Sequence, residues 1–424
     1  MVYVLSNTGK PLMPTEDHRM VRLLLRDKKA KVVSRTPFTI QMLISTKTYT
    51  QPISLGVNAG SKTIGLSATT KTKELYASEV TLRNDVMKLI ATRKELRRGR
   101  RGRKTRYRKP RLNNRARSKH KGWLAPSVEQ KINTHIQAVK QVMKILPVTK
   151  ITVETASFDI QKIKNPDISG IGYQQGDQLG FWNVREYVLF RDGHKCQCCH
   201  GKSKDPVLNV HHIESRQTGG NAPNNLITLC ETCHKAYHKG KLALPKHIKR
   251  GMSFRDAAFM GIMRWTFYNR LKELYPNIPV GLTYGYITKN TRIKNGLPKT
   301  DAIDALCISG NPNVKRLDHV FIQVAKRRHN RQIHRCNPGK GGKRRLNQSP
   351  KYVFGFQLFD KILYQNQEYF VFGRRKTGDF DIRQLDGTII SNHASYKKLK
   401  KLQSRKTLLI SRQNRRDVVA QPRS

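Results

Sequence analysis

The sequence predicts a multidomain α+β protein whose β-rich core is interrupted by a small metal-bound module. Short runs of alternating apolar and polar residues predict strands in well-separated regions of the chain. Five of the seven cysteines fall within the 38 positions 196–233, as expected of a metal site in an unsecreted protein. With 424 residues, 37% of them hydrophobic, the chain can fill about three cores of ~100–150 residues each. These observations exclude a wholly disordered basic tail.

The excess of positive charge indicates the class of partner. The 83 Lys and Arg residues outnumber 28 Asp and Glu residues, which gives a formal net charge of +55. Self-repulsion on this scale opposes a compact state unless a polyanion neutralises it, and nucleic acid is the commonest polyanion inside cells. The sequence has no run of ~18 uncharged apolar residues and no signal-peptide pattern at its N-terminus. We therefore expect a soluble protein that binds nucleic acid and no membrane.

The first 80 residues predict two small β-containing units. In residues 1–50, short apolar runs flank a helix-like stretch at 20–25, which is typical of a β-α-β module. Residues 52–70 predict two strands joined by a tight, glycine-bearing turn, and a third strand is expected near 74–80. Together these three strands predict an antiparallel meander.

An arginine-rich stretch follows at residues 93–121. It contains 16 Lys or Arg residues and one acidic residue, Glu95. An isolated helix with charges of one sign would repel itself, so we expect a helix or arm that lies against RNA or DNA. The expected RNA-binding residues are Arg97, Arg98, Arg100, Arg101, Arg103 and Arg106.

The remaining elements follow from hydrophobic spacing. Apolar residues at helical intervals predict a helix over 132–146 that Pro147 ends, and a buried strand is expected over 150–154. A second basic stretch, 326–345, contains three glycines and predicts a linker or a nucleic-acid-binding arm. Further strand or helix signals lie at 280–286, 302–308 and 353–390, the last with a hairpin at Asp386-Gly387.

Two equal cysteine spacings predict a zinc site. Cys196 and Cys199 form one CxxC pair, and Cys230 and Cys233 form the other. Four thiolates can bind Zn²⁺ tetrahedrally and stabilise a module too small for a large core. Cys198 remains an alternative ligand.

Histidines lie between and beside the two cysteine pairs. His211 and His212 occupy an expected strand at 208–213, and a loop leads from there into a helix that carries His234. This arrangement resembles the zinc-knuckle branch of the ββα-metal HNH nucleases. The resemblance implies that His212 is the general base, that His211 and His234 bind Mg²⁺, and that Asn225 orients the region of the base. Many HNH motifs have Asp at the His211 position.

A second set of polar residues is spread along the chain. The hairpin that contains Asn58 lacks the glycine and lysine spacing of a phosphate-binding loop. The order of hairpin, strand and helix resembles a split RNase H-like nuclease core of the RuvC type. By that resemblance Glu154 belongs to the second segment, and Asp301 and Asp304, one helical turn apart, belong to the third, where carboxylates bind catalytic Mg²⁺. RuvC cores begin with a strand-borne Asp, whereas this chain has Asn58.

The order of all these segments resembles the IscB family of transposon-encoded RNA-guided nucleases, considered ancestral to the dual-nuclease CRISPR effectors. The shared features are PLMP at 11–14, RRGRR at 97–101, and an HNH module inserted between RuvC-like segments; they cover about residues 1–312. The resemblance implies these divisions: a PLMP domain (1–50), RuvC-like segment I (51–92), an arginine-rich bridge helix (93–121), segment II (122–181), a zinc-knuckle HNH nuclease (182–245), segment III (246–312), a basic linker or RNA-binding arm (313–350) and a C-terminal β domain (351–424).

The resemblance also implies an activity. The protein would bind a structured guide RNA and cleave target double-stranded DNA, with HNH cutting the guide-paired strand and RuvC the displaced strand; Asn58 would make it a nickase. Its cofactors would be catalytic Mg²⁺, structural Zn²⁺ and the guide RNA. We expect a monomeric ribonucleoprotein in a prokaryotic cytoplasm, associated with the nucleoid when it acts. Arg374, Arg375 and Lys376 of the C-terminal β domain are the expected readers of a short motif beside the target.

Two other functions are compatible with parts of the sequence. The first is a guide-free HNH endonuclease of the homing or restriction type, against which the arginine-rich helix between two nuclease segments argues. The second is a non-catalytic nucleic-acid-binding transposon protein, which Asn58 favours and His212 disfavours.

Overall fold

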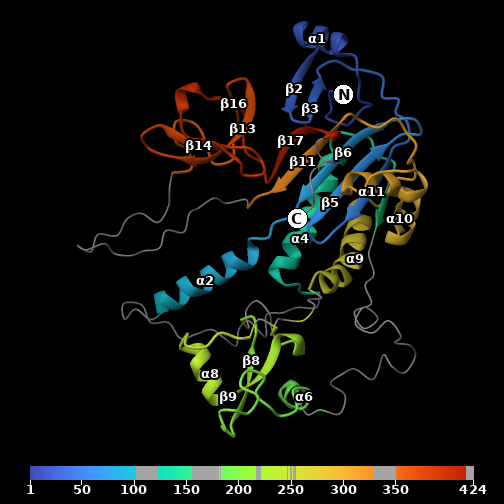
Figure 1. Cartoon of the computed structure of the whole chain (residues 1–424). Helices are drawn as coiled ribbons and strands as arrows, with labels where there is room; N and C mark the ends of the chain where they lie inside the picture. Colours follow the sequence, from blue (N-terminus) through green and yellow to red (C-terminus); the bar gives the residue numbers. More distant parts are fainter. Residues whose placement is uncertain are drawn as a thin grey trace. The chain divides into compact units, whose positions relative to one another are not determined.

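A computed structural model describes residues 1–101, 122–154, 181, 183–215, 221–245, 247–248, 251, 255–327 and 350–416 (Figure 1). The chain divides into two compact units. The larger comprises Met1–Ser157 and Met260–Ser424, and the smaller comprises Phe158–Phe259. Within the described residues, none of the helices is long and apolar enough to cross a membrane.

The larger unit is built on a seven-stranded mixed sheet in the order β10-β7-β4-β5-β6-β11-β17. The expected meander is present, because β5 pairs antiparallel with both β4 and β6. Strands β4, β7 and β10 run parallel to one another, so their carboxyl ends share one edge of the sheet. The strands are β4 (Ser54–Ala59), β5 (Thr63–Thr69), β6 (Glu74–Thr81), β7 (Lys150–Glu154), β10 (Val280–Thr283), β11 (His319–Ala325) and β17 (Leu408–Asn414).

One helix of the larger unit lies directly on this sheet. Helix α11 (Asp301–Ile308) packs against β4 and β5, and the contact depends on two glycines. A Cβ atom added at Gly65 would lie 1.8 Å from the backbone oxygen of Asp301, and one at Gly56 would lie 2.0 Å from that of Ala305. The glycines of the hairpin therefore serve close helix packing, and this packing places the first turn of α11 beside β4.

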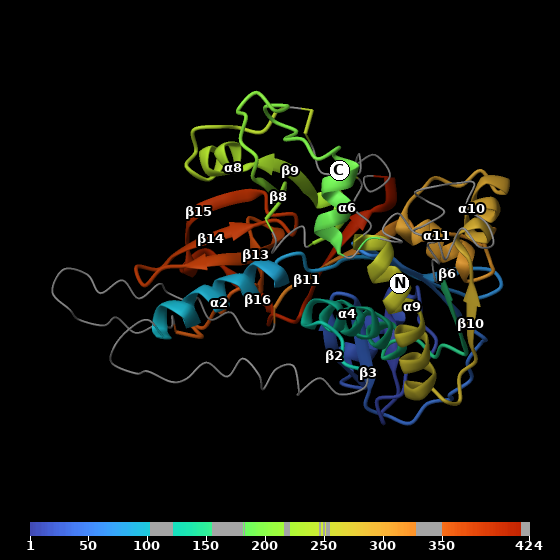
Figure 2. The same ribbon diagram turned by 90° about the horizontal axis from the view of Figure 1, so that it is seen from below.

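Other helices flank the sheet or extend from it. Figure 2 shows α4 and α9 from a second direction. The helix expected over 132–146 begins and ends earlier than predicted, with Pro126 as its first residue. The expected strand at 280–286 ends at Thr283, and a helix begins two residues later. The helices are α2 (Val86–Arg101), α4 (Pro126–Met143), α9 (Arg255–Leu274) and α10 (Gly285–Lys294).

Two strands correct the expected domain boundaries. The basic linker predicted at 313–350 contains β11, which pairs parallel with β6 in the core sheet. The last strand of the predicted C-terminal domain, β17, pairs with β11 across seven residue pairs. Five of the seven side chains of β11 are buried, so this apolar run, and not the basic residues after it, decides its place. The remaining predicted linker residues, 328–349, lie outside the described part of the chain.

The N-terminal residues form the expected β-α-β module. Its sheet has the order β1-β3-β2, and helix α1 (His18–Arg26) follows the PLMP segment. Leu12 of that segment is buried, and its backbone N–H donates to Val4 O at 2.9 Å. The strands are β1 (Tyr3–Leu5), β2 (Ala30–Arg35) and β3 (Phe38–Met42).

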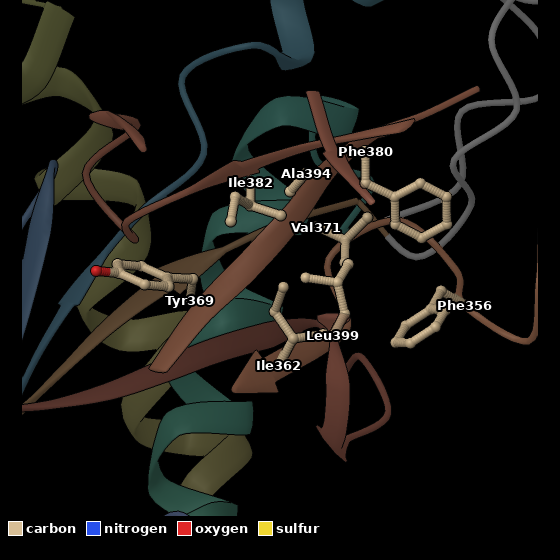
Figure 3. Close-up of a cluster of buried hydrophobic side chains, with 8 residues drawn as sticks. All are labelled: Phe356, Ile362, Tyr369, Val371, Phe380, Ile382, Ala394 and Leu399. Atoms are coloured by element: carbon tan, nitrogen blue, oxygen red, sulfur yellow. The ribbon is translucent and has the colours of Figure 1, made fainter. Parts of the chain in front are cut away.

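The C-terminal residues form a separate five-stranded antiparallel sheet in the order β15-β14-β13-β12-β16. The predicted hairpin at Asp386-Gly387 is confirmed, because β14 and β15 pair on either side of it. The strands are β12 (Lys361–Tyr364), β13 (Gln367–Arg374), β14 (Asp379–Arg383), β15 (Ile389–Ser395) and β16 (Lys400–Gln403). Figure 3 shows its core, which consists of Phe356, Ile362, Tyr369, Val371, Phe380, Ile382, Ala394 and Leu399.

The smaller unit contains a two-stranded antiparallel sheet of β8 (Leu208–His212) and β9 (Leu226–Cys230). Helix α6 (Val184–Arg191) precedes the sheet, and α8 (Glu231–His238) follows β9 without an intervening loop. The sequence predicted that a loop leads directly into the helix. The sequence analysis did not predict β9. The four residues before Cys230, Leu-Ile-Thr-Leu, are a run too short to tell a strand from the beginning of a helix.

A buried histidine in α4 predicts how the stability of the larger unit depends on pH. The Nδ1 atom of His135 lies 2.8 Å from Lys131 O, and its Nε2 atom lies 3.1 Å from Gly60 O. Burial lowers the pKa of His135 to about 4. Because the unfolded chain binds the proton first, stability should fall as the pH drops from ~6.5 towards about 4, by at most ~3 kcal/mol.

Calorimetry at pH 7 and pH 5 tests this expectation. The melting temperature of the larger unit should fall on acidification. In the His135→Gln variant this melting temperature should fall less, because the glutamine side chain does not bind a proton in this pH range. His393→Gln, at an exposed site in β15, serves as the control and should behave as the wild type. Equal acid shifts in the wild type and in His135→Gln would contradict the assignment.

Candidate functional site

The expected carboxylates of the split core meet at the shared edge of β4, β7 and β10. Asn58 of β4 is the register partner of Glu154, the last residue of β7. Glu154 is in turn the partner of Thr283, the last residue of β10. Parallel strands place these positions side by side although they are far apart in sequence. Asp301 opens α11 at the same place, since its carboxylate contacts the Asn58 side chain.

The contacts of Asp301 are short and polar. Asn58 Nδ2 donates to Asp301 Oδ1 at 3.3 Å, and Thr63 Oγ1 donates to Asp301 Oδ2 at 2.6 Å. The hydroxyl of Thr300 caps α11 by accepting from the N–H of Ile303 at 3.1 Å. The carboxylate therefore stands in the first turn of a capped helix, where the helix dipole favours negative charge.

The surroundings of Glu154 change its pKa. Burial raises its pKa, and the negative charges of Asp304 and Asp301 raise it further, while the hydrogen bond that Thr288 Oγ1 donates to Glu154 Oε2 opposes the shift. Asp304 itself pairs with Arg292, Nε to Oδ1, at 3.0 Å. Oxygen ligands from three acids suit a hard cation such as Mg²⁺, which would have to compete with the guanidinium of Arg292.

The four predicted zinc ligands of the smaller unit come together. The Sγ atoms of Cys196, Cys199, Cys230 and Cys233 all lie within 4.8 Å of one another. The Sγ atoms of Cys199 and Cys230 are 3.8 Å apart, which equals the edge of a tetrahedron of ~2.3 Å Zn–S bonds, about 3.8 Å. The donors therefore fit a structural Zn²⁺, and the cluster does not include Cys198.

The thiols of this cluster differ in acidity. Hydrogen bonds from Ser203 lower the pKa of Cys199 to about 5, whereas burial raises the pKa of Cys233. Cys230 is the N-cap of α8 and accepts from the N–H of Cys233 at 3.4 Å. The cysteine cluster thus holds the start of the helix whose later turns carry the functional histidines.

Three histidines form a second cluster in the smaller unit. The ring nitrogens of His211, His234 and His238 lie within 4.8 Å of one another. Sequence reasoning missed His238, although it lies four residues after His234 and so on the same face of α8. Burial lowers the pKa of His211 to about 4, and the neighbouring histidines lower it further. A neutral imidazole is the form that binds a metal ion.

The donor chemistry of this histidine cluster does not fit the predicted Mg²⁺. Mg²⁺ demands oxygen ligands, whereas imidazole nitrogen suits Zn²⁺ and other late first-row ions. The Nε2 atoms of His234 and His238 are 3.3 Å apart. That is close to the ~3.4 Å edge of a tetrahedron with ~2.1 Å metal–nitrogen bonds. Three imidazole nitrogens would hold a transition-metal ion more readily than the Mg²⁺ predicted at His211 and His234, and which ion binds there stays a prediction.

The predicted base stands next to this cluster on β8. His212 Nε2 donates to Asn221 Oδ1 at 3.0 Å, an interaction that was not predicted. Asn225 is buried, and its side chain makes two hydrogen bonds to the backbone of Glu214. Its Oδ1 accepts from the N–H of Glu214 at 2.9 Å, and its Nδ2 donates to Glu214 O at 3.0 Å. Asn225 thus fixes the backbone two residues beyond His212, while its expected role in catalysis stays a prediction.

The predicted RNA-binding arginines are placed only in part. Arg97 and Arg98 are exposed on α2. Arg100 and Arg101 belong to the last turn of α2, but the structure does not describe their side chains. Arg103 and Arg106 lie outside the described residues. The helix begins at Val86, earlier than the predicted bridge at 93–121.

Two of the expected motif readers in the C-terminal domain are used within the protein. Arg374 donates to the backbone oxygens of Lys351, Phe356 and Pro350 at 2.6, 2.8 and 3.2 Å. Arg375 Nη1 donates to Asn392 O. The three bonds of Arg374 stabilise the fold of the β domain, so the expectation that Arg374 reads bases is not supported. Arg375 is exposed and has other N–H donors besides the one bonded to Asn392 O, so its role, like that of the exposed Lys376, stays a prediction.

Comparisons with known proteins match two regions of the chain. The model of a family described as RRXRR protein matches residues 2–176, and that of HNH endonuclease matches residues 196–240. Anaredoxin of Nostoc sp. (strain PCC 7120 / SAG 25.82 / UTEX 2576) is 35% identical over 65 residues, which are 15% of this chain and 83% of that protein.

Solved structures of larger proteins are also similar in part. Streptococcus thermophilus Cas9 in complex with the AGGA PAM has 15% identity and a TM-score of 0.30 over 44% of this chain and 26% of that chain. The Type II-C Cas9 enzyme from Actinomyces naeslundii has 11% identity and a TM-score of 0.26 over 62% and 60% of the two chains. The match thus spans about a quarter of the Streptococcus thermophilus protein.

Proposed function

From the premise that this chain is an IscB-like protein, with an RRXRR region joined to an HNH endonuclease domain, we propose that it is an RNA-guided DNA endonuclease. In this proposal it binds a structured guide RNA, pairs the guide with one strand of double-stranded DNA and acts as a monomeric ribonucleoprotein. The observation that carries the proposal is the placement of His212, oriented by Asn221, beside the three-histidine cluster. Polar groups with these roles are what phosphodiester hydrolysis requires.

The hydrogen bond of His212 assigns the roles of its two ring nitrogens. Because Nε2 donates to Asn221, Nδ1 carries the lone pair and can take a proton from a water molecule. Asn225 holds the adjoining turn and would thereby help to fix the orientation of the His212 ring relative to an attacking water molecule. A metal ion held by His211, His234 and His238 would supply charge stabilisation to the phosphate and the leaving oxygen.

The second site is assigned to the displaced strand. Glu154, Asp301 and Asp304 would hold Mg²⁺ at the edge of the core sheet, because a bound cation would relieve the repulsion among these carboxylates that contributes to the raised pKa of Glu154. Asn58 contributes no charge there. We propose that HNH cuts the guide-paired strand and that this second site is impaired.

Sequencing of RNA that copurifies with the protein tests the proposal. One abundant structured species is expected, because the net charge of +55 needs many phosphates and a guide would supply them. Programming the guide portion of that species should redirect cleavage to a new target. Cleavage at a fixed DNA sequence without bound RNA would instead favour a guide-free endonuclease.

Replacement of Arg97, Arg98, Arg100 and Arg101 by alanine should weaken RNA binding and flatten its salt dependence. Each lost phosphate contact lowers the slope of log K against log salt by ~0.7–0.9. Changing the same four residues to lysine keeps the charge and should keep most of the slope. An unchanged slope in the alanine variant would show that these side chains do not contact phosphates.

A further inference from the structure

Two exposed tyrosines, Tyr284 and Tyr286, follow the end of β10 at Thr283. The side chains of Tyr284 and Tyr286 are 52% and 65% exposed. Their ring centroids lie 6.1 Å apart, and the ring planes differ by 12°. A nearly parallel pair of exposed aromatic rings offers flat apolar faces, and packing among the described residues leaves these faces largely uncovered. Successive bases of a single strand stack on side chains presented in this way.

The tyrosine pair is attached to the carboxylate edge of the sheet. Thr283, the residue before Tyr284, is the register partner of Glu154. Gly285 separates the two tyrosines, and a Cβ atom added there would lie 3.2 Å from Glu154 Oε1. Thr288 donates to the carboxylate of Glu154 and lies 3.4 Å from Tyr284 O. The backbone of Gly285 therefore lies close to the carboxylate of Glu154, and the two tyrosines are the residues directly before and after this glycine.

The charges around the pair favour a polyanion. Helix α10, which begins at Gly285, contains no acidic residue, and Lys289 and Lys294 are exposed on it. Cationic side chains beside aromatic faces are the combination that binds single-stranded nucleic acid, because they contact phosphates and bases together. A double helix would hide the base faces from the rings. The occupant that fits is thus an unpaired strand.

We propose that Tyr284 and Tyr286 stack against unpaired bases of single-stranded DNA and position that strand for the Glu154, Asp301 and Asp304 carboxylates. DNA is favoured over RNA because the pair adjoins the site assigned to DNA cleavage. This inference rests on the proposed function in that one respect. Tyr284 and Tyr286 are positioning residues for the displaced strand.

Fluorescence of 2-aminopurine in a thymidine oligonucleotide tests the proposal. The full chain is added to saturation without Mg²⁺, and stacking of the probe base on a ring quenches its emission. The wild type and the Tyr284→Phe/Tyr286→Phe variant should quench, because both keep two aromatic faces. Tyr284→Leu/Tyr286→Leu should lose the quenching and bind the oligonucleotide about tenfold or more weakly, with an unchanged salt slope.

A control and a second assay separate the possible failures. Tyr49→Leu changes a tyrosine that is 87% exposed elsewhere and should leave the quenching intact. Three results would each overturn the proposed stacking on Tyr284 and Tyr286. They are undiminished quenching with the double leucine variant, loss of quenching with the double phenylalanine variant, and quenching only when the probe is in an RNA oligonucleotide. Guided cleavage of the guide-paired strand is measured on the same variants. Absence of guided cleavage by the wild type would reject the proposed function. The fluorescence result would still decide whether the two tyrosines stack on bases.

Discussion

With Asn58 in place, the protein is expected to cut the guide-paired strand of a programmed target and to leave the displaced strand largely intact. The carboxylate edge of the core has three acids, and Asn58 turns its amide Nδ2 towards Asp301 at 3.3 Å. A positively polarised N–H group therefore faces the Oδ1 atom of Asp301, an oxygen that a cation would need as a ligand. Loss of a residue that only orients a metal ligand weakens metal binding by ~10–100-fold, and loss of an anionic ligand should cost at least as much.

Asn58→Asp should restore cleavage of the displaced strand. The new carboxylate would lie beside Asp301 and opposite Glu154, so the repulsion among these groups favours a bound cation. His212→Ala should reduce cleavage of the guide-paired strand by ~10²–10⁴-fold, the range for loss of a general base, and keep guided binding. The double variant Asn58→Asp/His212→Ala should cut the displaced strand alone.

Separate end labels on the two DNA strands measure these outcomes. Asn58→Gln is the matched control, since it stays neutral and should not restore the second cut. Equal cleavage of both strands by the Asn58 protein would show that Glu154, Asp301 and Asp304 suffice, and the weight given to the missing charge would be wrong.

Cys230→Ser is expected to unfold the smaller unit. Structural zinc contributes ~10–16 kcal/mol in small zinc-bound folds, so the loss of one buried thiolate removes a large part of the stability of such a unit. Cys230 also caps α8, and that helix carries His234 and His238. Zinc content, the melting of the smaller unit and cleavage of the guide-paired strand should therefore fall together.

Cys198→Ser provides the control for this experiment. Cys198 lies two residues after Cys196 but is not in the four-cysteine cluster, so its variant should keep zinc, melting and cleavage. Pure folded protein with almost no zinc, or unchanged melting of Cys230→Ser, would contradict the structural role. Loss of zinc from Cys198→Ser instead would reassign the fourth ligand.

The sequence predicted the cysteine cluster completely because equal CxxC spacings leave few arrangements for four thiols. The resemblance also named the polar residues that gather at the core edge, where Asn58 is the last but one residue of β4, Glu154 ends β7 and Asp301 begins α11. His238 was missed because a second histidine one turn along α8 carries no motif by itself. Asn221 could not be predicted, because its contact with His212 depends on how the intervening loop returns to β8.

Two of the predicted domain limits do not match the strands of the core sheet. The division into segments assigned residues 313–350 to a basic linker or RNA-binding arm, although the basic stretch itself begins at residue 326, after the apolar run of β11. The place of β17 in the core depends on pairing with that strand. The local sequence does not show that β17, unlike β12–β16, joins the core sheet and not the C-terminal sheet, because pairing with a distant strand determines its place.

The position of β11 and β17 in the core sheet sets the order in which the protein can assemble during translation. Strand β6 ends at Thr81, but the strand that pairs with its free side begins at His319, and β17 follows only at Leu408. The nascent core therefore waits with an open edge while the ribosome adds residues at ~5–20 per second. The smaller unit, encoded between these strands, has local contacts and can fold during that delay. The high positive charge would keep neighbouring nascent chains apart until the edge is covered.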